Sequence, residues 1–297
     1  MTGTLLDAAR RYAQAHADGD GIARTPVSGL TVIRETRPGV LHYAISRPLV
    51  ALVLQGAKRV SLGASTFDFA AGASLLITAD VPTVSQITRA TPGTPYLALV
   101  VELDPAVIAE LVIEIGPAPF AAGMPVRVDP TEAEVADSAL RLMRLLDRPR
   151  SLPVLHGQLV RELHYWLLSG RHGGAIRTLG VADSHAQRIA RAVALIRTGF
   201  AQPLRVERLA QAAGMSPSAF HHHFRTVTSL TPLRFQKQLR LIEARRMMLA
   251  DGVTIGSAAH GVGYESVSQF TRDYGRMFGT PPGRDMRAVR QRMQAAA

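Results

Sequence analysis

A repeated unit of roughly 50 residues dominates the C-terminal part of this 297-residue chain. Residues 209–216 (LAQAAGMS) match residues 258–265 (AAHGVGYE) at an offset of 49, which pairs Ala210 with Ala259 and Gly214 with Gly263. One residue is inserted at this point, and the match continues at an offset of 50 through Phe220 and Phe270, Phe224 and Tyr274, and Pro232 and Pro282. Such self-similarity indicates that one supersecondary unit is built twice. We therefore expect two similar helical subdomains.

Each copy contains the elements of a helix-turn-helix. Its alanine is small enough to let two helices cross closely, and four residues later its glycine can adopt the left-handed conformation that ends the first helix. In the first copy, Ser216 can cap the second helix and Pro217 can take its first position. In the second copy, Ser266 and Gln269 have the spacing of a capping box. These signals predict helix-turn-helix motifs at about residues 204–228 and 254–279.

The second helix of each copy has one apolar and one polar face. At about 100° per residue, the apolar faces comprise Phe220, Phe224 and Val227 in one copy and Phe270, Tyr274 and Met277 in the other. The opposite faces carry short polar side chains, neutral or basic, which can contact base edges in a major groove. The predicted DNA-binding residues are Ser218, His221, His222, Arg225, Ser268, Gln269, Thr271 and Arg272. Apolar stripes occur in any small helical domain, so this interpretation depends on the repeat, the caps and the polar faces together.

Positive charge is concentrated in the same part of the chain. Residues 182–297 contain 17 Lys and Arg against 7 Asp and Glu, whereas residues 1–181 contain 17 against 16. The asymmetry favours a polyanion-binding C-terminal domain, although a basic surface kept for solubility would give the same balance.

A single helix is expected between the two copies, over residues 233–249. It would be about 25 Å long at 1.5 Å per residue, which bridges most of the roughly 34 Å between successive major-groove sites on one DNA face. Lys237, Arg240, Arg245 and Arg246 lie on this helix. Two interpretations of these cations stay open at this point, contact with DNA phosphates and ordinary solvated helix surface.

The first 175 residues indicate an antiparallel β-domain with covering helices, so the whole chain is predicted to be α+β. Short apolar segments broken by Gly and Pro predict strands at residues 31–36, 42–46, 49–55, 58–62, 66–69, 74–78, 85–88 and 96–102. This spacing is typical of a sandwich or barrel. Asp104 and Pro105 predict a helix to about residue 115, and Thr131 with Glu134 predicts a capping box for the next helix.

Two helical stripes follow the predicted strands. They comprise Val135, Ala139, Leu142 and Leu146, and then Leu155, Leu159, Leu163 and Trp166. We expect both helices to cover the sheet, with a dimer face on one of them as the alternative. Residues 169–183 contain four glycines and little periodicity, which predicts a linker. The domains are therefore expected at residues 1–175, a regulatory and dimerisation domain, and at residues 183–297, a DNA-binding domain.

Several kinds of site are disfavoured. The chain has no cysteine, which removes disulfides, thiolate metal sites and thiol nucleophiles. His42 is the only histidine within residues 30–101, too few for a metal-dependent enzyme built on clustered histidines. The consecutive histidines 221–223 diverge by about 100° per residue on a helix and cannot converge on one metal ion. We expect no cofactor, no metal and no enzyme activity.

The apolar runs are much shorter than the roughly 20 residues that cross a membrane, so no membrane partner is expected. The first residues show no basic-then-apolar leader, which together with the absence of cysteine favours a cytoplasmic location. The remaining alternative is a protein that coats DNA without sequence preference. Such a protein needs positive charge, but not capped helices with neutral polar faces.

The second copy contains the pattern Ile255-x3-Ala259-x3-Gly263-Tyr264-x5-Phe270-x3-Tyr274-x3-Phe278-Gly279-x2-Pro282. With GMSPSAFHHHFRTVTSLTP and FQKQLRLIEARRMML in the first copy, it resembles the AraC/XylS family of transcription regulators. The strand order and the stretch RELHYWLLSG resemble the branch of that family with an N-terminal cupin-like domain. Three positions depart from the pattern: His260 and Gly261 replace commoner helix formers, and Ser229 stands where the first copy often has glycine.

The resemblance implies two three-helix subdomains joined by a long helix, each placing its second motif helix in one of two adjacent major grooves of double-stranded DNA. Carried over by position, it implies base contacts by Ser218, His221, His222, Ser268, Gln269, Thr271 and Arg272. It also implies RNA polymerase as a partner and activation as the sign of regulation. We further hypothesise that the N-terminal barrel binds a small-molecule effector and forms a homodimer. A barrel filled by side chains would argue against an internal ligand site and leave dimerisation as its role.

Overall fold

The computed structural model describes residues 3–39, 41–63, 65–116 and 125–296, with side chains as far as residue 291. The chain divides into two compact units. One comprises Met1–Arg188 with Thr226–Ser229, and the other Ile189–Arg225 with Leu230–Ala297.

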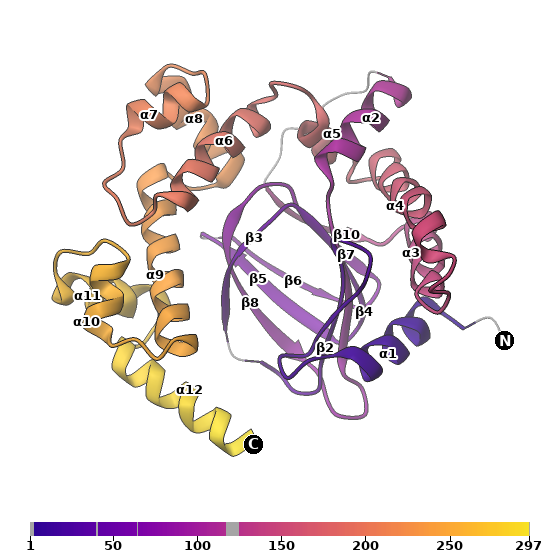
Figure 1. The fold of residues 1–297 in the computed structure, drawn as a ribbon, viewed down its shortest axis with the longest axis horizontal. Coiled ribbons are helices and arrows are strands. Elements are labelled where there is room, and N and C mark those ends of the chain that lie inside the picture. Colours follow the sequence, from indigo (N-terminus) through magenta and orange to yellow (C-terminus); the bar gives the residue numbers. More distant parts are fainter. Residues whose placement is uncertain (1–2, 40, 64, 117–124, 297) are drawn as a thin grey trace. The chain divides into compact units, whose positions relative to one another are not determined.

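Two antiparallel sheets form the framework of the first unit (Figure 1). The larger has the strand order β1-β2-β9-β4-β7-β10 and the smaller has the order β3-β8-β5-β6. The strands are β1 (Ile22–Arg24), β2 (Leu30–Glu35), β3 (His42–Ser46), β4 (Leu49–Gln55), β5 (Ala57–Leu62), β6 (Ser65–Ala70), β7 (Ala73–Ile77), β8 (Val81–Arg89), β9 (Tyr96–Glu102) and β10 (Val126–Pro130). All eight predicted strands are present, and β3, β4 and β9 have the predicted bounds. Sequence analysis missed β1 and β10, the two edge strands of the larger sheet.

Apolar side chains from both sheets occupy the space between them. Val53 on β4 and Tyr96 on β9 face Val60 and Leu62 on β5, and all four are at most 2% exposed. Alternate residues of the larger sheet, such as Leu97, point to its other face and pack against helices. This arrangement confirms an antiparallel β-domain with covering helices.

The covering helices are α1 (Leu5–His16), α2 (Pro105–Ile115), α3 (Ala133–Leu145), α4 (Leu152–Ser169) and α5 (Gly173–Gly180). Helix α2 begins as predicted, since Oδ1 of Asp104 accepts the N–H of Ala106 at 2.8 Å. In α3 the stripe from Val135 to Leu142 is buried. In α4 the stripe packs from Leu159 onward, with Leu163 buried, whereas Leu155 is 43% exposed. Sequence analysis missed α1, whose signal is the capping box of Thr4 and Asp7.

The capping box predicted at Thr131 is wrong. Helix α3 has Glu132 as its N-cap, without a side-chain hydrogen bond. The N–H of Thr131 donates instead to the carbonyl of Gly72 at 2.9 Å, which extends the pairing of β10 with β7. The carboxylate of Glu132 accepts the N–H of Arg171 at 3.1 Å. Sheet pairing therefore takes precedence here over the local capping signal.

The linker predicted at residues 169–183 is also wrong over most of its length, because Gly173–Gly180 form α5. Ile176 is fully buried, and the guanidinium of Arg177 donates to the carbonyl of Gly116 at 3.0 Å. A Cβ at Gly180 would lie 2.6 Å from Cγ2 of Ile108. The glycine permits α5 to approach α2 closely, so it serves packing rather than flexibility.

The second unit is built from helices. They are α6 (His185–Thr198), which begins in the first unit, then α7 (Val206–Ala212), α8 (Pro217–Thr228), α9 (Pro232–Ala250), α10 (Ile255–Gly261), α11 (Val267–Phe278) and α12 (Pro282–Ala296). Helix α9 is the predicted connector, with α7 and α8 near one end and α10 and α11 near the other (Figure 1). Within the described residues, no helix is long and apolar enough to cross a bilayer.

Candidate nucleic-acid interface

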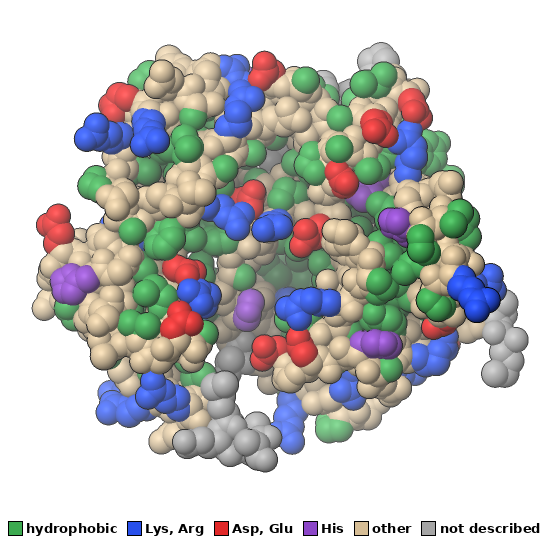
Figure 2. Space-filling view, viewed as in Figure 1, with side chains coloured by type: hydrophobic (Ala, Val, Ile, Leu, Met, Phe, Trp, Pro, Cys, Tyr) green, Lys and Arg blue, Asp and Glu red, His purple; other side chains and the backbone are tan. Residues whose placement is uncertain are grey.

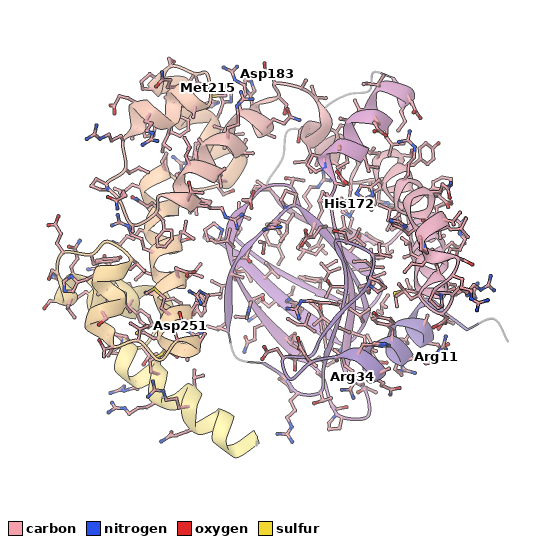
Figure 3. All side chains as sticks on the ribbon, viewed as in Figure 1. Arg11, Arg34, His172, Asp183, Met215 and Asp251 are labelled. Carbon is pink, nitrogen blue, oxygen red and sulfur yellow. The ribbon has the colours of Figure 1, made fainter. Side chains whose placement is uncertain are left out.

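The two turns of the repeat have the same hydrogen-bond pattern. Gly214 has φ +60° and Gly263 has φ +85°, so both glycines are left-handed as predicted. In the first turn, the N–H of Met215 donates to the carbonyl of Ala210 at 2.9 Å. In the second turn, the N–H of Tyr264 donates to the carbonyl of Ala259, also at 2.9 Å. Figure 3 labels Met215 at the turn between α7 and α8.

The second helix of each copy starts at the predicted serine. Oγ of Ser216 accepts the N–H of Ala219 at 3.3 Å, and Pro217 is the first residue of α8. Oγ of Ser266 accepts the N–H of Gln269, also at 3.3 Å, at the start of α11. Each turn and cap together set the direction in which the second helix leaves the first.

Aromatic residues fix one face of each second helix against its own subdomain. Phe220 and Phe224 on α8 are fully buried, and Phe224 meets Phe235 of α9 edge-on with ring centroids 5.7 Å apart. Phe270 and Tyr274 on α11 are also fully buried, with centroids 5.5 Å apart. The opposite faces of α8 and α11 are thereby turned away from the core.

The predicted DNA-binding residues lie on those outward faces. Seven of the eight are exposed, namely Ser218, His221, His222, Arg225, Ser268, Gln269 and Arg272, and Thr271 is half-buried. Among the described residues, neither Arg225 nor Arg272 has an ion-pair partner. At the offset of 50, Ser218, His221 and His222 match Ser268, Thr271 and Arg272, whereas Arg225 and Gln269 each belong to one copy alone. Each set includes one guanidinium that can make a bidentate contact.

Two families of known proteins match this chain, one in each part of the sequence. The family described as "AraC-type transcriptional regulator N-terminus" matches residues 26–175. The chain belongs to the AraC-type transcriptional regulators. A family described as "Helix-turn-helix domain" matches residues 209–288, which extend from within α7 through α8, α10 and α11. The resemblance carried by the sequence motif is thus confirmed.

Individual relatives match this AraC-type regulator over limited lengths. The RCS-specific HTH-type transcriptional activator RclR of Escherichia coli is 40% identical over 86 residues, which are 29% of this chain and 30% of RclR. The probable thc operon regulatory protein of Rhodococcus erythropolis is 28% identical over 210 residues, 66% of this chain and 62% of that protein. These matches therefore span less than two thirds of either relative.

A solved structure covers far more of the chain. The apo form of a ToxT variant from Vibrio cholerae matches with a TM-score of 0.57 and 8% identity, covering 89% of this chain and 98% of that one. At this identity the match shows a shared fold. It agrees with the order seen here, an N-terminal β-domain followed by a helical region with the repeated motif.

In this AraC-type regulator the four cations of α9 considered above have partners within the protein. Lys237 Nζ lies 2.7 Å from Oδ2 of Asp273, and Arg245 Nε lies 2.9 Å from Oδ2 of Asp285. Arg246 pairs with Glu243 at 2.7 Å and with Asp251 at 3.4 Å, and Arg240 donates to backbone carbonyls. The solvated-surface interpretation fits Arg246 and Lys237, whose side chains are 53% and 43% exposed, whereas Arg245 is largely buried and Arg240 binds main chain. Contact of these cations with DNA phosphates stays a prediction.

Other arginines of the second unit are more exposed than most of these cations. Side chains that are exposed, and that lack an ion-pair partner among the described residues, are Arg205, Arg208, Arg225, Arg234, Arg272, Arg284, Arg287 and Arg290. Figure 2 shows Lys and Arg side chains at the surface over α7 and α8 and over α12. Sequence analysis missed most of these residues because exposure and pairing depend on the fold.

Two carboxylates, one buried and one partly buried, help to hold α11 in place. Asp273 is 5% exposed and also accepts the hydroxyl of Tyr264 at 3.4 Å, and Asp285 accepts the hydroxyl of Tyr274 at 2.7 Å. Burial, followed by the nearby Asp273 carboxylate, raises the pKa of Tyr264 well above its ordinary value. The phenol therefore stays protonated and remains a donor at neutral pH.

The departures from the family pattern do not break the motifs. Helix α10 runs through His260 and ends at Gly261. Ser229 has φ +60°, a left-handed conformation like that of its counterpart Gly279 at +73°. The backbone requirement is thus the same in both copies, although the first copy meets it with serine.

Proposed function

We propose that this protein is a sequence-specific transcription regulator whose helices α8 and α11 read adjacent major-groove segments of double-stranded DNA. The observation that carries the proposal is the duplication of the turn, the cap and the outward polar face within one compact unit. A protein that coats DNA without sequence preference would not need two capped helices with matching faces.

In this proposal the eight outward residues divide by role. Arg225 and Arg272 are suited to bidentate contact with guanine, and Gln269 to adenine. Ser218, Ser268 and Thr271 present hydroxyls that can donate or accept, and His221 and His222 can do the same through their ring nitrogens. The exposed arginines outside these faces would neutralise phosphates and hold the protein in register.

Helix α9 is consistent with two reading heads on one DNA face. Its 19 residues give a length of about 28 Å at 1.5 Å per residue, close to the roughly 34 Å between successive major-groove sites. The helices that pack at the two ends of α9 are wide enough to span the remaining distance.

On the basis of family membership, we assign to this protein response to an effector, self-association and contact with RNA polymerase. We expect these functions in the cytoplasm. One matched structure is described as unsaturated fatty acid bound ToxT, which supports a small-molecule effector for this protein as well. Buried side chains occupy the space between the two sheets, so an internal effector would have to open a space among them. Self-association through the helices outside the sheet needs no such change.

Salt dependence tests whether DNA is the partner. A protein that contacts on the order of six to ten phosphates should lose about 10³–10⁵-fold in affinity between 50 and 200 mM salt, because binding releases condensed counterions. Fluorescence anisotropy with a labelled duplex, titrated at several salt concentrations, measures this slope. Affinity that hardly changes over this range would contradict DNA binding by the second unit.

A further inference from the structure

Arg240 makes an unusual set of contacts from the middle of α9. Its guanidinium donates to four backbone carbonyls, those of Phe200 at 2.6 Å, Ala201 at 3.1 Å, Gln202 at 3.0 Å and Gly263 at 2.9 Å. The first three belong to the connection between α6 and α7, and Gly263 forms the turn between α10 and α11. One side chain therefore joins the first helix-turn-helix subdomain to the second.

Gln236, one turn earlier on α9, strengthens the same junction. Its side chain is 3% exposed, and Nε2 donates to the carbonyls of Phe200 at 2.9 Å and Gln202 at 2.7 Å. The connection between α6 and α7 is thus held to α9 by two side chains that together bind three successive carbonyls.

The connection between α6 and α7 also touches the turn between α10 and α11 directly. A Cβ at Gly263 would lie 2.0 Å from the carbonyl oxygen of Ala201, so only a glycine lets the backbones come this close. Gly263 therefore has two functions, since it reverses the chain before α11 and receives the backbone of the first subdomain.

From these contacts we propose that Arg240, supported by Gln236, is a positioning residue that fixes the separation and relative orientation of α8 and α11. A single connecting helix would by itself let the two subdomains bend and rotate relative to each other. A second contact between the subdomains removes that freedom. Arg240 makes this contact, between the connection of α6 with α7 and the turn of α10 with α11. The proposal rests on the proposed function and adds to it that the protein accepts one spacing between its two half-sites.

The chemistry of the side chain explains why arginine is needed. A guanidinium has five donors in a fixed plane, and four carbonyls in different directions use most of them. Lysine keeps the charge but has a single ammonium with three donors, so Arg240→Lys should break the bridge without changing net charge. Gln236→Leu removes two hydrogen bonds at nearly the same side-chain volume.

The first test measures the distance between the two helices without DNA. Because the chain has no cysteine, Ser218→Cys and Ser268→Cys place one spin label at the start of each helix in the full-length protein. Pulsed electron resonance should give one narrow distance distribution for the parent. The distribution should broaden in Arg240→Lys and in Gln236→Leu, and stay narrow in the matched control Arg246→Gln, whose side chain touches neither turn. An unchanged narrow distribution in Arg240→Lys, with normal circular dichroism, would overturn the proposal; if that variant does not fold, Gln236→Leu decides in the same way.

The second test measures spacing preference on DNA. A selected site is varied by one or two base pairs between its halves, and binding to each duplex is compared at one salt concentration. The parent and Arg246→Gln should favour one spacing by on the order of tenfold, since other spacings must twist or bend the DNA. Arg240→Lys should lose this preference while keeping its base preference within each half. An unchanged spacing preference in Arg240→Lys would overturn the positioning role. If the parent protein selects no site, the proposed function is overturned, and the distance measurement without DNA alone decides the role of Arg240.

Discussion

Gly263→Ala should strongly destabilise the second helix-turn-helix subdomain, by about 3 kcal/mol or more. Two costs act together at this position. Its φ of +85° disfavours any residue with a Cβ, and that Cβ would lie 2.0 Å from the carbonyl oxygen of Ala201. Hydrogen exchange of the full-length protein is the appropriate measurement, because it reports local stability and should show faster exchange in residues 255–278.

Gly279→Ala is the matched control for this substitution. Gly279 has φ +73°, but within the described residues a Cβ there would meet no atom closer than 4 Å. The control should therefore lose only about 1 kcal/mol, the conformational cost alone. If both variants lost the same protection from exchange, the contact between Gly263 and Ala201 would contribute nothing to the stability of the subdomain.

Arg272→Ala should change which base pairs are preferred in the half-site read by α11. A bidentate contact between a guanidinium and guanine contributes about 1–3 kcal/mol of discrimination against the wrong base. Arg272 is exposed on α11 and has no ion-pair partner among the described residues, so its guanidinium is available for such a contact. Binding to a library randomised at every position of the site measures the effect position by position.

Arg276→Ala is the control because it removes the same charge from the same helix. The guanidinium of Arg276 lies 3.7 Å from Oδ1 of Asp273, so it already has a partner within the protein. We expect a small loss of affinity that is equal for all sequences. A uniform loss for Arg272→Ala as well would mean that this face of α11 contacts backbone rather than bases.

The features predicted well from the sequence are those set by neighbouring residues. The left-handed Gly214 and Gly263, the serine caps of α8 and α11 and the span of α9 depend on contacts within a few residues. The outward position of the predicted DNA-binding residues follows from helical periodicity once the buried aromatics are identified. Base contact by these residues stays a prediction until it is measured on DNA.

The features that were missed or wrong depend on distant parts of the chain. Lys237 and Arg245 are neutralised by Asp273 and Asp285, which lie 36 and 40 residues further on, so no local pattern identifies them as structural. Gly180 looks like a linker residue until α2 packs against it, and Thr131 looks like a cap until β10 pairs with β7. In each case a tertiary contact outweighs a valid local signal.

The central claim is that α8 and α11 read neighbouring turns of one duplex as a fixed pair. Repeated selection of random double-stranded DNA by the purified full-length protein, followed by sequencing, tests this claim most directly. The account predicts a bipartite motif, with two different half-sites whose centres are about 10–10.5 base pairs apart. Selection of a single short half-site, of two half-sites at variable spacing, or of no sequence at all would contradict it.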